Sequence, residues 1–171
     1  MEVPDGFDDL VHDAMAGSSE AARALFEANW EHVWKVAYGL LGRRAEADDV
    51  AQEAFISAFS NLRKFEQRSS FRTWITRIAI NKALNALRQE RGRQALWEEP
   101  QAHADDPGLR RELLAALASL PPERRTVVVL RYWLGYSITE IAELLAVPAG
   151  TINSRLARGL EHLRSRLEVT P

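Results

Sequence analysis

Cysteine is absent from the 171 residues, which excludes disulfides and thiolate metal sites. No apolar run approaches the roughly 18 residues that a membrane-spanning helix requires. The first residues, Met-Glu-Val-Pro-Asp-Gly, are acidic and lack the basic and apolar regions of a signal peptide. We therefore expect a soluble, cytoplasmic protein without membrane insertion.

The sequence also has few features of an enzyme active site. Its four histidines are scattered, it has no glycine-rich phosphate loop, and no nucleophile has a paired base. Asp48, Asp49 and Glu53 could share a metal ion on one helix, but no second cluster completes a coordination shell. The sequence predicts a protein that acts by binding, without a metal or other cofactor.

The composition, 46% hydrophobic and 27% charged, is that of a globular protein with one medium or two small domains. Its net charge of −2 hides an alternation along the chain. The net charges of residues 1–60, 61–97, 98–123 and 124–171 are −8, +7, −4 and +3. Two basic blocks suggest two DNA-facing surfaces, and the acidic blocks suggest a different partner.

Helical periodicity and chain breakers predict an all-α fold of two small helical domains joined by a flexible linker. Residues 92–108 lack periodicity and hold two prolines and two glycines, which is typical of a linker. The predicted domains are residues 1–91 and 109–171. The expected helices lie near 8–16, 19–41, 45–62, 71–91 and 109–118, followed by one that ends near 134 and a helical hairpin.

The hairpin, residues 137–158, predicts a helix-turn-helix at the C-terminus. Ser137 and Glu140 fit a capping box at its start, and Pro148 suits the first turn of the second helix. Helical spacing directs Ile152, Leu156 and Leu163 inward and leaves four polar side chains outside: Asn153, Ser154, Arg155 and Arg158. That polar face could enter a DNA major groove, or it could be the solvated side of an ordinary hairpin.

The helix predicted over 45–62 has an apolar stripe and, opposite it, a face without any basic residue. The members of that second face are Asp49, Gln52, Glu53, Ile56 and Ser60. A solvated face normally mixes both charge signs, and this one also exposes an isoleucine. It therefore favours docking against a basic partner helix.

The helix predicted over 71–91 carries basic and amide groups beside an aromatic ring. Its stripe consists of Trp74, Arg77, Asn81, Asn85 and Arg88, flanked by Arg72, Lys82 and Arg91. This mixture suits phosphate neutralisation and stacking on unpaired bases. The alternatives are a tryptophan that belongs to the core and arginines that form a solvated face.

In their order and spacing these motifs resemble bacterial RNA polymerase sigma factors. Residues 41–42, 47–55 and 71–81, together with Arg88, are similar to the main conserved domain of that family. Residues 120–125, 140–142 and 150–158 are similar to its domain that binds the promoter −35 element. The short linker resembles the compact extracytoplasmic-function (ECF) group, and the resemblance covers roughly residues 8–167.

The resemblance implies an initiation factor that binds core RNA polymerase, reads the −35 and −10 promoter elements and promotes DNA melting. Residues 1–91 would bind polymerase and the −10 element, and residues 109–171 the −35 element. The family often works with an anti-sigma factor, so such a partner is also expected. The alternative is a stand-alone helix-turn-helix regulator with an N-terminal sensor or dimerisation domain, although such a domain would not need the +7 block.

The resemblance and the helix faces described above together predict roles for single residues. Those expected to bind core polymerase are Asp49, Gln52, Glu53 and Ile56. Those expected at the −10 element, partly from the loop 64–70 that would capture a flipped base, are Lys64, Ser69, Ser70, Arg72, Trp74, Arg77, Asn81 and Arg88. Those expected at the −35 element are Thr151, Asn153, Ser154, Arg155, Ala157 and Arg158.

Two positions depart from the family pattern. Asn153 stands where a basic residue is common, and Ala157 where a larger side chain often occurs. The resemblance therefore implies a different sequence preference, and weaker contact, at the −35 element.

Overall fold

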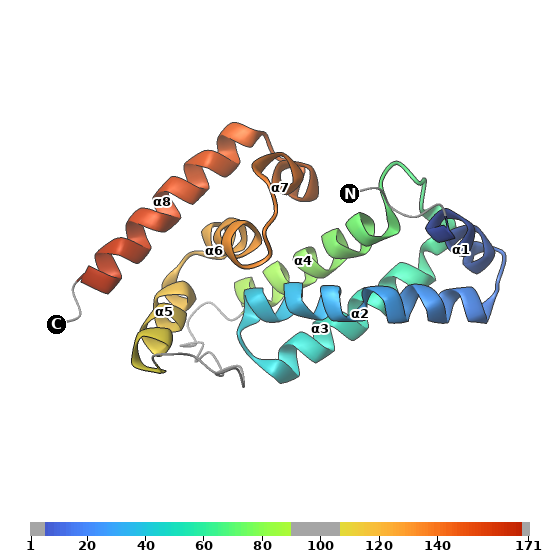
Figure 1. The fold of residues 1–171 in the computed structure, drawn as a ribbon, viewed down its shortest axis with the longest axis horizontal. Coiled ribbons are helices and arrows are strands. Elements are labelled where there is room, and N and C mark those ends of the chain that lie inside the picture. Colours follow the sequence, from blue (N-terminus) through green and yellow to red (C-terminus); the bar gives the residue numbers. More distant parts are fainter. Residues whose placement is uncertain (1–5, 90–106, 169–171) are drawn as a thin grey trace.

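The computed structural model describes residues 6–89 and 107–168, and these ranges are helical with no β-strand among them. The N-terminal half, residues 6–89, contains α1 (Gly6–Met15), α2 (Ser19–Leu41), α3 (Arg44–Ser60), the short 3-10 turn η1 (Leu62–Lys64) and α4 (Phe71–Gln89), as Figure 1 shows. The C-terminal half, residues 107–168, contains α5 (Pro107–Ser119), α6 (Pro122–Val128), the π-helix η2 (Val129–Trp133), α7 (Ile138–Leu145) and α8 (Ala149–Glu168). The all-α prediction is confirmed.

Most of the predicted linker lies outside the described residues, as do Arg91 and His103. Where the described chain resumes, α5 already begins at Pro107, inside the predicted linker range. None of the helices described combines the length and apolar character that crossing a bilayer demands.

Local signals in the sequence account for the helix ends. The Ser18 hydroxyl accepts a hydrogen bond from the Ala21 amide at 3.2 Å, which starts α2. Gly42 ends the same helix in the left-handed conformation, with φ of 75°, where a side chain would add strain. The capping box of Ser137 and Glu140 is present at the start of α7, as predicted.

The helix predicted to continue to about residue 134 changes type on the way. After Val128 the α6 helix widens into the π-helix η2, which ends at Trp133. Val129 and Leu130 point into the core, whereas Tyr132 and Trp133 remain 62% and 42% exposed. Helical periodicity does not show such a change here, because the helix ends at Trp133 and no later turn follows in which a shifted register could be seen.

The two halves share a hydrophobic core. One cluster contains N-terminal residues only, among them Leu25, Phe55 and Ile75. The larger cluster combines residues of both halves, including Leu40 and Ile80 from the first and Val127 and Ile141 from the second. The two helical domains are therefore packed against each other.

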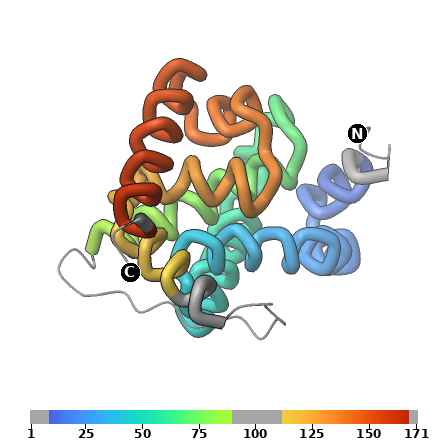
Figure 2. Tube along the Cα trace, turned by 60° about the vertical axis from the view of Figure 1, so that its left-hand side comes forward, coloured from blue at the N-terminus to red at the C-terminus, as the bar shows by residue number. Residues whose placement is uncertain are grey.

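Figures 1 and 2 show how the halves meet. Helices α6 and α7 pack against α4, and η2 packs against α2. Helix α8 packs on α5, α6 and α7, so it lies on the side of the C-terminal half away from α4.

Candidate polymerase and nucleic-acid interfaces

The face of α3 opposite the core is exposed, as the sequence predicts. Asp49, Gln52, Glu53 and Ile56 all lie on it, and Ile56 is 65% exposed. The neighbouring helix α4 supplies one base, because Lys82 Nζ pairs with Glu53 at 3.2 Å. The part of this face nearer the start of α3, around Asp49, is therefore the candidate acidic docking surface.

The start of α4 combines packing with local capping. Trp74 is half-buried, and its ring stacks on Phe65 with the centroids 4.8 Å apart. The Ser70 hydroxyl accepts a hydrogen bond from the Thr73 amide at 3.1 Å, which caps the helix. Trp74 is thus partly a core residue and Ser70 partly a structural one, while Lys64 is exposed and Ser69 half-buried.

Two of the arginines expected at the −10 element reach across to other helices. The Arg72 guanidinium donates to Asn29 Oδ1 at 3.1 Å and to the Ala28 carbonyl at 3.2 Å, which ties α4 to α2. Arg77 donates to the carbonyls of Leu144 and Glu143, at 3.2 and 2.8 Å, in the last turn of α7.

Further along α4, Arg88 pairs with Glu123 of α6 at 3.2 Å. Asn81 and Asn85, which lie between Arg77 and Arg88 on the stripe, are exposed. The predicted basic stripe exists, but its arginines already have acceptors in the protein.

The second helix of the hairpin presents the face that its sequence predicts, with one exception. Ile152, Leu156 and Leu163 are buried. The exposed residues of the face are Asn153, Ser154, Ala157 and Arg158. Thr151 is half-buried, and its carbonyl accepts a hydrogen bond from the Ser154 hydroxyl at 3.0 Å.

The exception is Arg155, whose predicted exposure is wrong. This side chain is half-buried and lies near enough to Glu123 of α6 for its charge to favour the carboxylate. The reason is geometric: α8 packs on α6, and one polar edge of α8 falls at that contact.

Two family models match this chain in succession. Residues 25–93 match sigma-70 region 2, and residues 110–163 match sigma-70 region 4. The ECF RNA polymerase sigma factor SigW of Bacillus subtilis is 32% identical over 170 residues, an alignment that covers 88% of this chain and 91% of SigW. The chain belongs to the ECF sigma factor family.

Solved structures of sigma factors share its fold. The structure of CnrH in complex with the cytosolic domain of CnrY matches with a TM-score of 0.73 and 25% identity, over 98% of this chain and 100% of that one. RpoE of Bartonella quintana, in a co-crystal with the anti-sigma factor NepR, matches with a TM-score of 0.70 over 87% of this chain and 98% of that one. Its 21% identity makes this second match evidence of fold alone.

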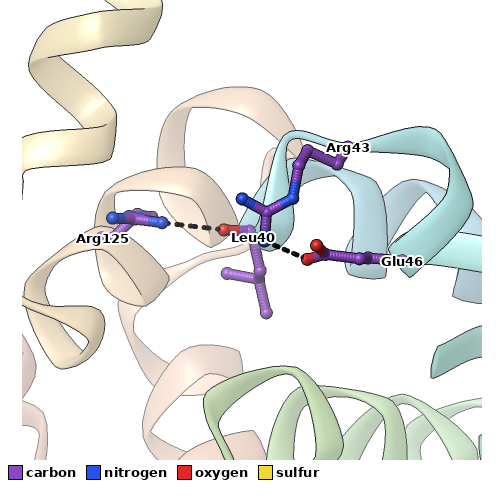
Figure 3. A network of polar contacts seen from close by, with 4 residues as sticks. All are labelled: Leu40, Arg43, Glu46 and Arg125. Carbon is purple, nitrogen blue, oxygen red and sulfur yellow. Dashed lines mark hydrogen bonds and ion pairs between the residues drawn. The ribbon is translucent and has the colours of Figure 1, made fainter. Parts of the chain in front are cut away.

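Sequence reasoning missed a buried arginine that joins the two halves of the sigma factor. Arg125 of α6 is 4% exposed and donates to the Leu40 carbonyl of α2 at 3.3 Å, as Figure 3 shows. It also donates to the carbonyls of Leu120, at 3.4 Å, and Ala118. Leu40 and Ala118 lie in the last turns of α2 and α5, where carbonyls lack intrahelical partners. The sequence signal for a buried arginine was its position directly before Thr126 and the apolar run 127–130.

A histidine also lies between the halves. The Nε2 atom of His32 is 3.1 Å from Thr76 Oγ1 and 2.9 Å from the Tyr136 hydroxyl. Burial, followed by the positive charges of Arg72 and Lys35, lowers the pKa of His32 from 6.5 to about 4. The ring is therefore neutral at physiological pH, and His32 is a packing residue.

Proposed function

We propose that this sigma factor binds core RNA polymerase, recognises the −35 and −10 promoter elements and promotes melting of the −10 region. The observation that carries the proposal is the presence of three different faces in one chain. One is acidic and apolar on α3, one is basic with amides on α4, and one is a helix-turn-helix face on α8. A stand-alone regulator would have no use for the first two.

The α3 face suits a basic helix of the polymerase. Asp49, Gln52 and Glu53 would supply acceptors, and the exposed Ile56 would supply an apolar anchor between them. Residues 1–91 would form the unit that binds polymerase and the −10 element, followed by a linker over 92–108.

Residues 109–171 would form the unit that binds the −35 element. Asn153, Ser154 and Arg158 project from α8 with the small Ala157 beside them, so base edges in a major groove would meet short polar side chains and one guanidinium. Thr151 and Arg155, both half-buried, would contact the groove from the edges of this face.

The α4 helix would hold the −10 element, with Asn81 as one of the two exposed amides of its stripe. Lys64, Ser69 and Ser70 precede the helix, and Arg72, Trp74, Arg77 and Arg88 lie along it. Melting would draw on binding energy alone, because a base held outside the stack offsets a few kcal/mol of unstacking. The protein would thus act in the cytoplasm as a binding factor, without covalent chemistry of its own.

An anti-sigma factor is a further partner under this proposal. Support comes from CnrH, which is 25% identical and matches 98% of this chain, and whose structure was solved in complex with the cytosolic domain of another protein, CnrY. Such a partner would regulate access of this chain to core polymerase.

Run-off transcription with purified core polymerase and a genomic promoter library tests the proposal. The wild-type chain should confer initiation on core enzyme at a defined set of promoters, whereas a stand-alone regulator would confer none. Asp49→Lys should abolish this activity, because a reversed charge against a basic partner costs several kcal/mol in affinity. Glu27→Lys, at an exposed position of α2, is the matched control and should initiate like the wild type. Initiation by Asp49→Lys at wild-type level would remove the α3 assignment.

A further inference from the structure

Arg72, in the first turn of α4, is held by two acceptors of the neighbouring helix α2. Its Nε atom donates to Asn29 Oδ1 at 3.1 Å, and its Nη2 atom donates to the Ala28 carbonyl at 3.2 Å. Both donors lie on one edge of the planar guanidinium, so the two bonds fix the plane of the group as well as its position. Unlike Arg77 and Arg88, Arg72 has these acceptors within the N-terminal half.

The acceptor of the Arg72 Nε–H group is itself a constrained side chain. Asn29 is 1% exposed, near the middle of α2, and its Nδ2 group donates to the Leu25 carbonyl at 2.8 Å. Because this bond uses the amide nitrogen, the amide oxygen is turned toward Arg72. A buried amide costs free energy unless its polar ends are bonded, and here each end has a partner. Asn29 is therefore a rigid acceptor for one edge of the guanidinium.

The other edge of the Arg72 guanidinium is directed away from α2. The side chain is exposed, and within residues 6–89 and 107–168 no further acceptor is found for its three remaining N–H groups. Two parallel N–H groups at the end of a guanidinium match two oxygen atoms of a phosphate. The loop 64–70, which is expected to hold an unpaired −10 base, ends two positions before Arg72. A cationic group of fixed orientation therefore lies beside that loop.

From these contacts we infer that Asn29 is a positioning residue for the −10 element: it orients Arg72 so that the outer edge of the guanidinium meets a phosphate of the unpaired strand. The inference rests on the function proposed above and adds to its −10 surface a buried residue of α2 that touches no DNA. An unanchored arginine would lose rotational freedom when it bound a phosphate, and this loss weakens binding. In the folded chain the arginine is already ordered, so strand binding is tighter.

Two substitutions at position 29 separate the orientation of Arg72 from its charge. Leucine has the same branched side-chain skeleton as asparagine but no acceptor, so Asn29→Leu frees the arginine and leaves its charge intact. Asn29→Asp retains an acceptor for the Nε–H group, but its carboxylate neutralises the arginine. The matched control is Thr76→Val, which removes a buried hydroxyl of α4 that bonds to His32.

Strand binding is measured on the holoenzyme that the chain forms with purified core polymerase. The probe is the labelled non-template strand across −10 of a promoter that run-off transcription has identified. Fluorescence anisotropy over a salt series reports its binding, with core polymerase alone as the background.

The state of the arginine is measured on the chain alone, by NMR titration of His32. After burial, the positive charge of Arg72 is a cause of the low pKa of His32. Release of the guanidinium from α2 should therefore raise the pKa of His32, whereas a purely local change at position 29 would leave it low.

Asn29→Leu should raise the pKa of His32 and weaken strand binding about fivefold, because one side chain must then be immobilised on binding. Its slope of log K against log salt should equal that of the wild type, since the phosphate contact remains. Asn29→Asp should weaken binding and flatten the slope by about 0.7, which corresponds to one phosphate contact on a single strand. Thr76→Val should bind like the wild type. In an Arg72→Met background, Asn29→Leu should have no further effect on strand binding.

Several results would overturn the inference while the proposed function stands. One is normal strand binding by Asn29→Leu, whatever the pKa of His32. Another is an equal loss in Asn29→Leu and Thr76→Val, or a loss that persists in the Arg72→Met background, because either would indicate a general disturbance of the fold. If Asn29→Leu does not fold, Asn29→Asp decides, and a wild-type salt slope in that variant contradicts the phosphate contact. If the wild-type holoenzyme itself does not bind the strand, the −10 assignment of α4 is wrong and the inference is overturned with it.

Discussion

The helices α4 and α8 carry similar mixtures of arginine and asparagine, yet the fold uses them differently. The arginine and amide of α8, Arg158 and Asn153, lie on an outer surface. On α4, Arg77 and Arg88 lie where the two halves meet and contact oxygen atoms of the C-terminal half. A polar stripe in a sequence therefore identifies the face that avoids the core, and the position of its helix decides whether that face is free for a ligand.

The largest effect should come from removing the buried arginine that links α6 to α2 and α5. Arg125→Met should lower the free energy of unfolding by about 3 kcal/mol, because buried carbonyls of α2 and α5 lose their donor. Urea denaturation measures the loss. The neighbouring Arg124→Met should cost less than about 1 kcal/mol, since Arg124 is only half-buried. Equal effects would mean that Arg125 contributes no more than an ordinary surface arginine.

Arginine-to-alanine changes on the two helices should separate stability from duplex binding. Arg158→Ala should leave stability within about 0.5 kcal/mol of the wild type and weaken duplex −35 binding by about 1–3 kcal/mol. Arg77→Ala should cost about 1 kcal/mol of stability, through the carbonyls of α7, and leave duplex −35 binding unchanged.

Thermal denaturation measures the stability of each variant. Electrophoretic mobility shift measures duplex binding, with promoter fragments that run-off transcription has identified. Similar behaviour of Arg77→Ala and Arg158→Ala in both assays would abolish the distinction between the helices.

Acidification should weaken the contact between the halves through His32. The pKa of His32 is about 4 in the folded chain and 6.5 ordinarily, so between these values the unfolded chain binds more protons. The free energy of unfolding should therefore have its full value above about pH 6.5 and should fall toward pH 4, by at most about 1.4 kcal/mol per pH unit.

A pH series of urea denaturations checks this effect. His32→Gln should flatten the dependence in that window, because no group at the Tyr136 contact then titrates. His12→Gln, at an exposed position, should retain the wild-type slope. A wild-type slope in the His32 variant would assign the pH dependence to other groups.

The smallest effect is expected at the exposed amide of α4. Asn81→Ala should cost about 1 kcal/mol in open-complex formation on duplex promoters, which is one hydrogen bond to an unpaired strand. On templates already unpaired at −10 the variant should recover most of its initiation. Permanganate footprinting of thymines around −10 measures the melting. Wild-type melting by Asn81→Ala would exclude this residue as a −10 contact.

The elements themselves could be predicted from the sequence because their signals are local. The Ser137 capping box, the end of α2 at Gly42 and the apolar stripe of α8 each depend on residues a few positions apart, and all three are confirmed. The contacts between the halves could not be predicted in this way. Arg77 and Arg125 bind carbonyls 66 and 85 positions away, and main-chain acceptors leave no mark in the sequence.

Long-range contacts also explain the remaining differences between the predicted and the observed structure. Arg155 follows the polar pattern of α8 but falls beside α6, so its half-buried state depends on how two helices cross. The π-helix at 129–133 packs against α2, which is a long-range contact. The candidate interfaces on α3 and α8 could be predicted from helical periodicity. The contacts between the α4 face and the C-terminal half could be identified only from the tertiary structure.

The shared core has a consequence for how the chain is made. Leu40, Leu41, Ile80 and Leu84 are covered by residues of the C-terminal half, which leave the ribosome later. At about 5–20 residues per second, the interval between completion of α4 and synthesis of Leu163 is roughly 4 to 15 seconds. During that time the nascent N-terminal half carries an uncovered apolar surface, which is the kind of surface that chaperones bind and that aggregates. We therefore expect a fragment that ends near residue 91 to be less soluble than the full chain.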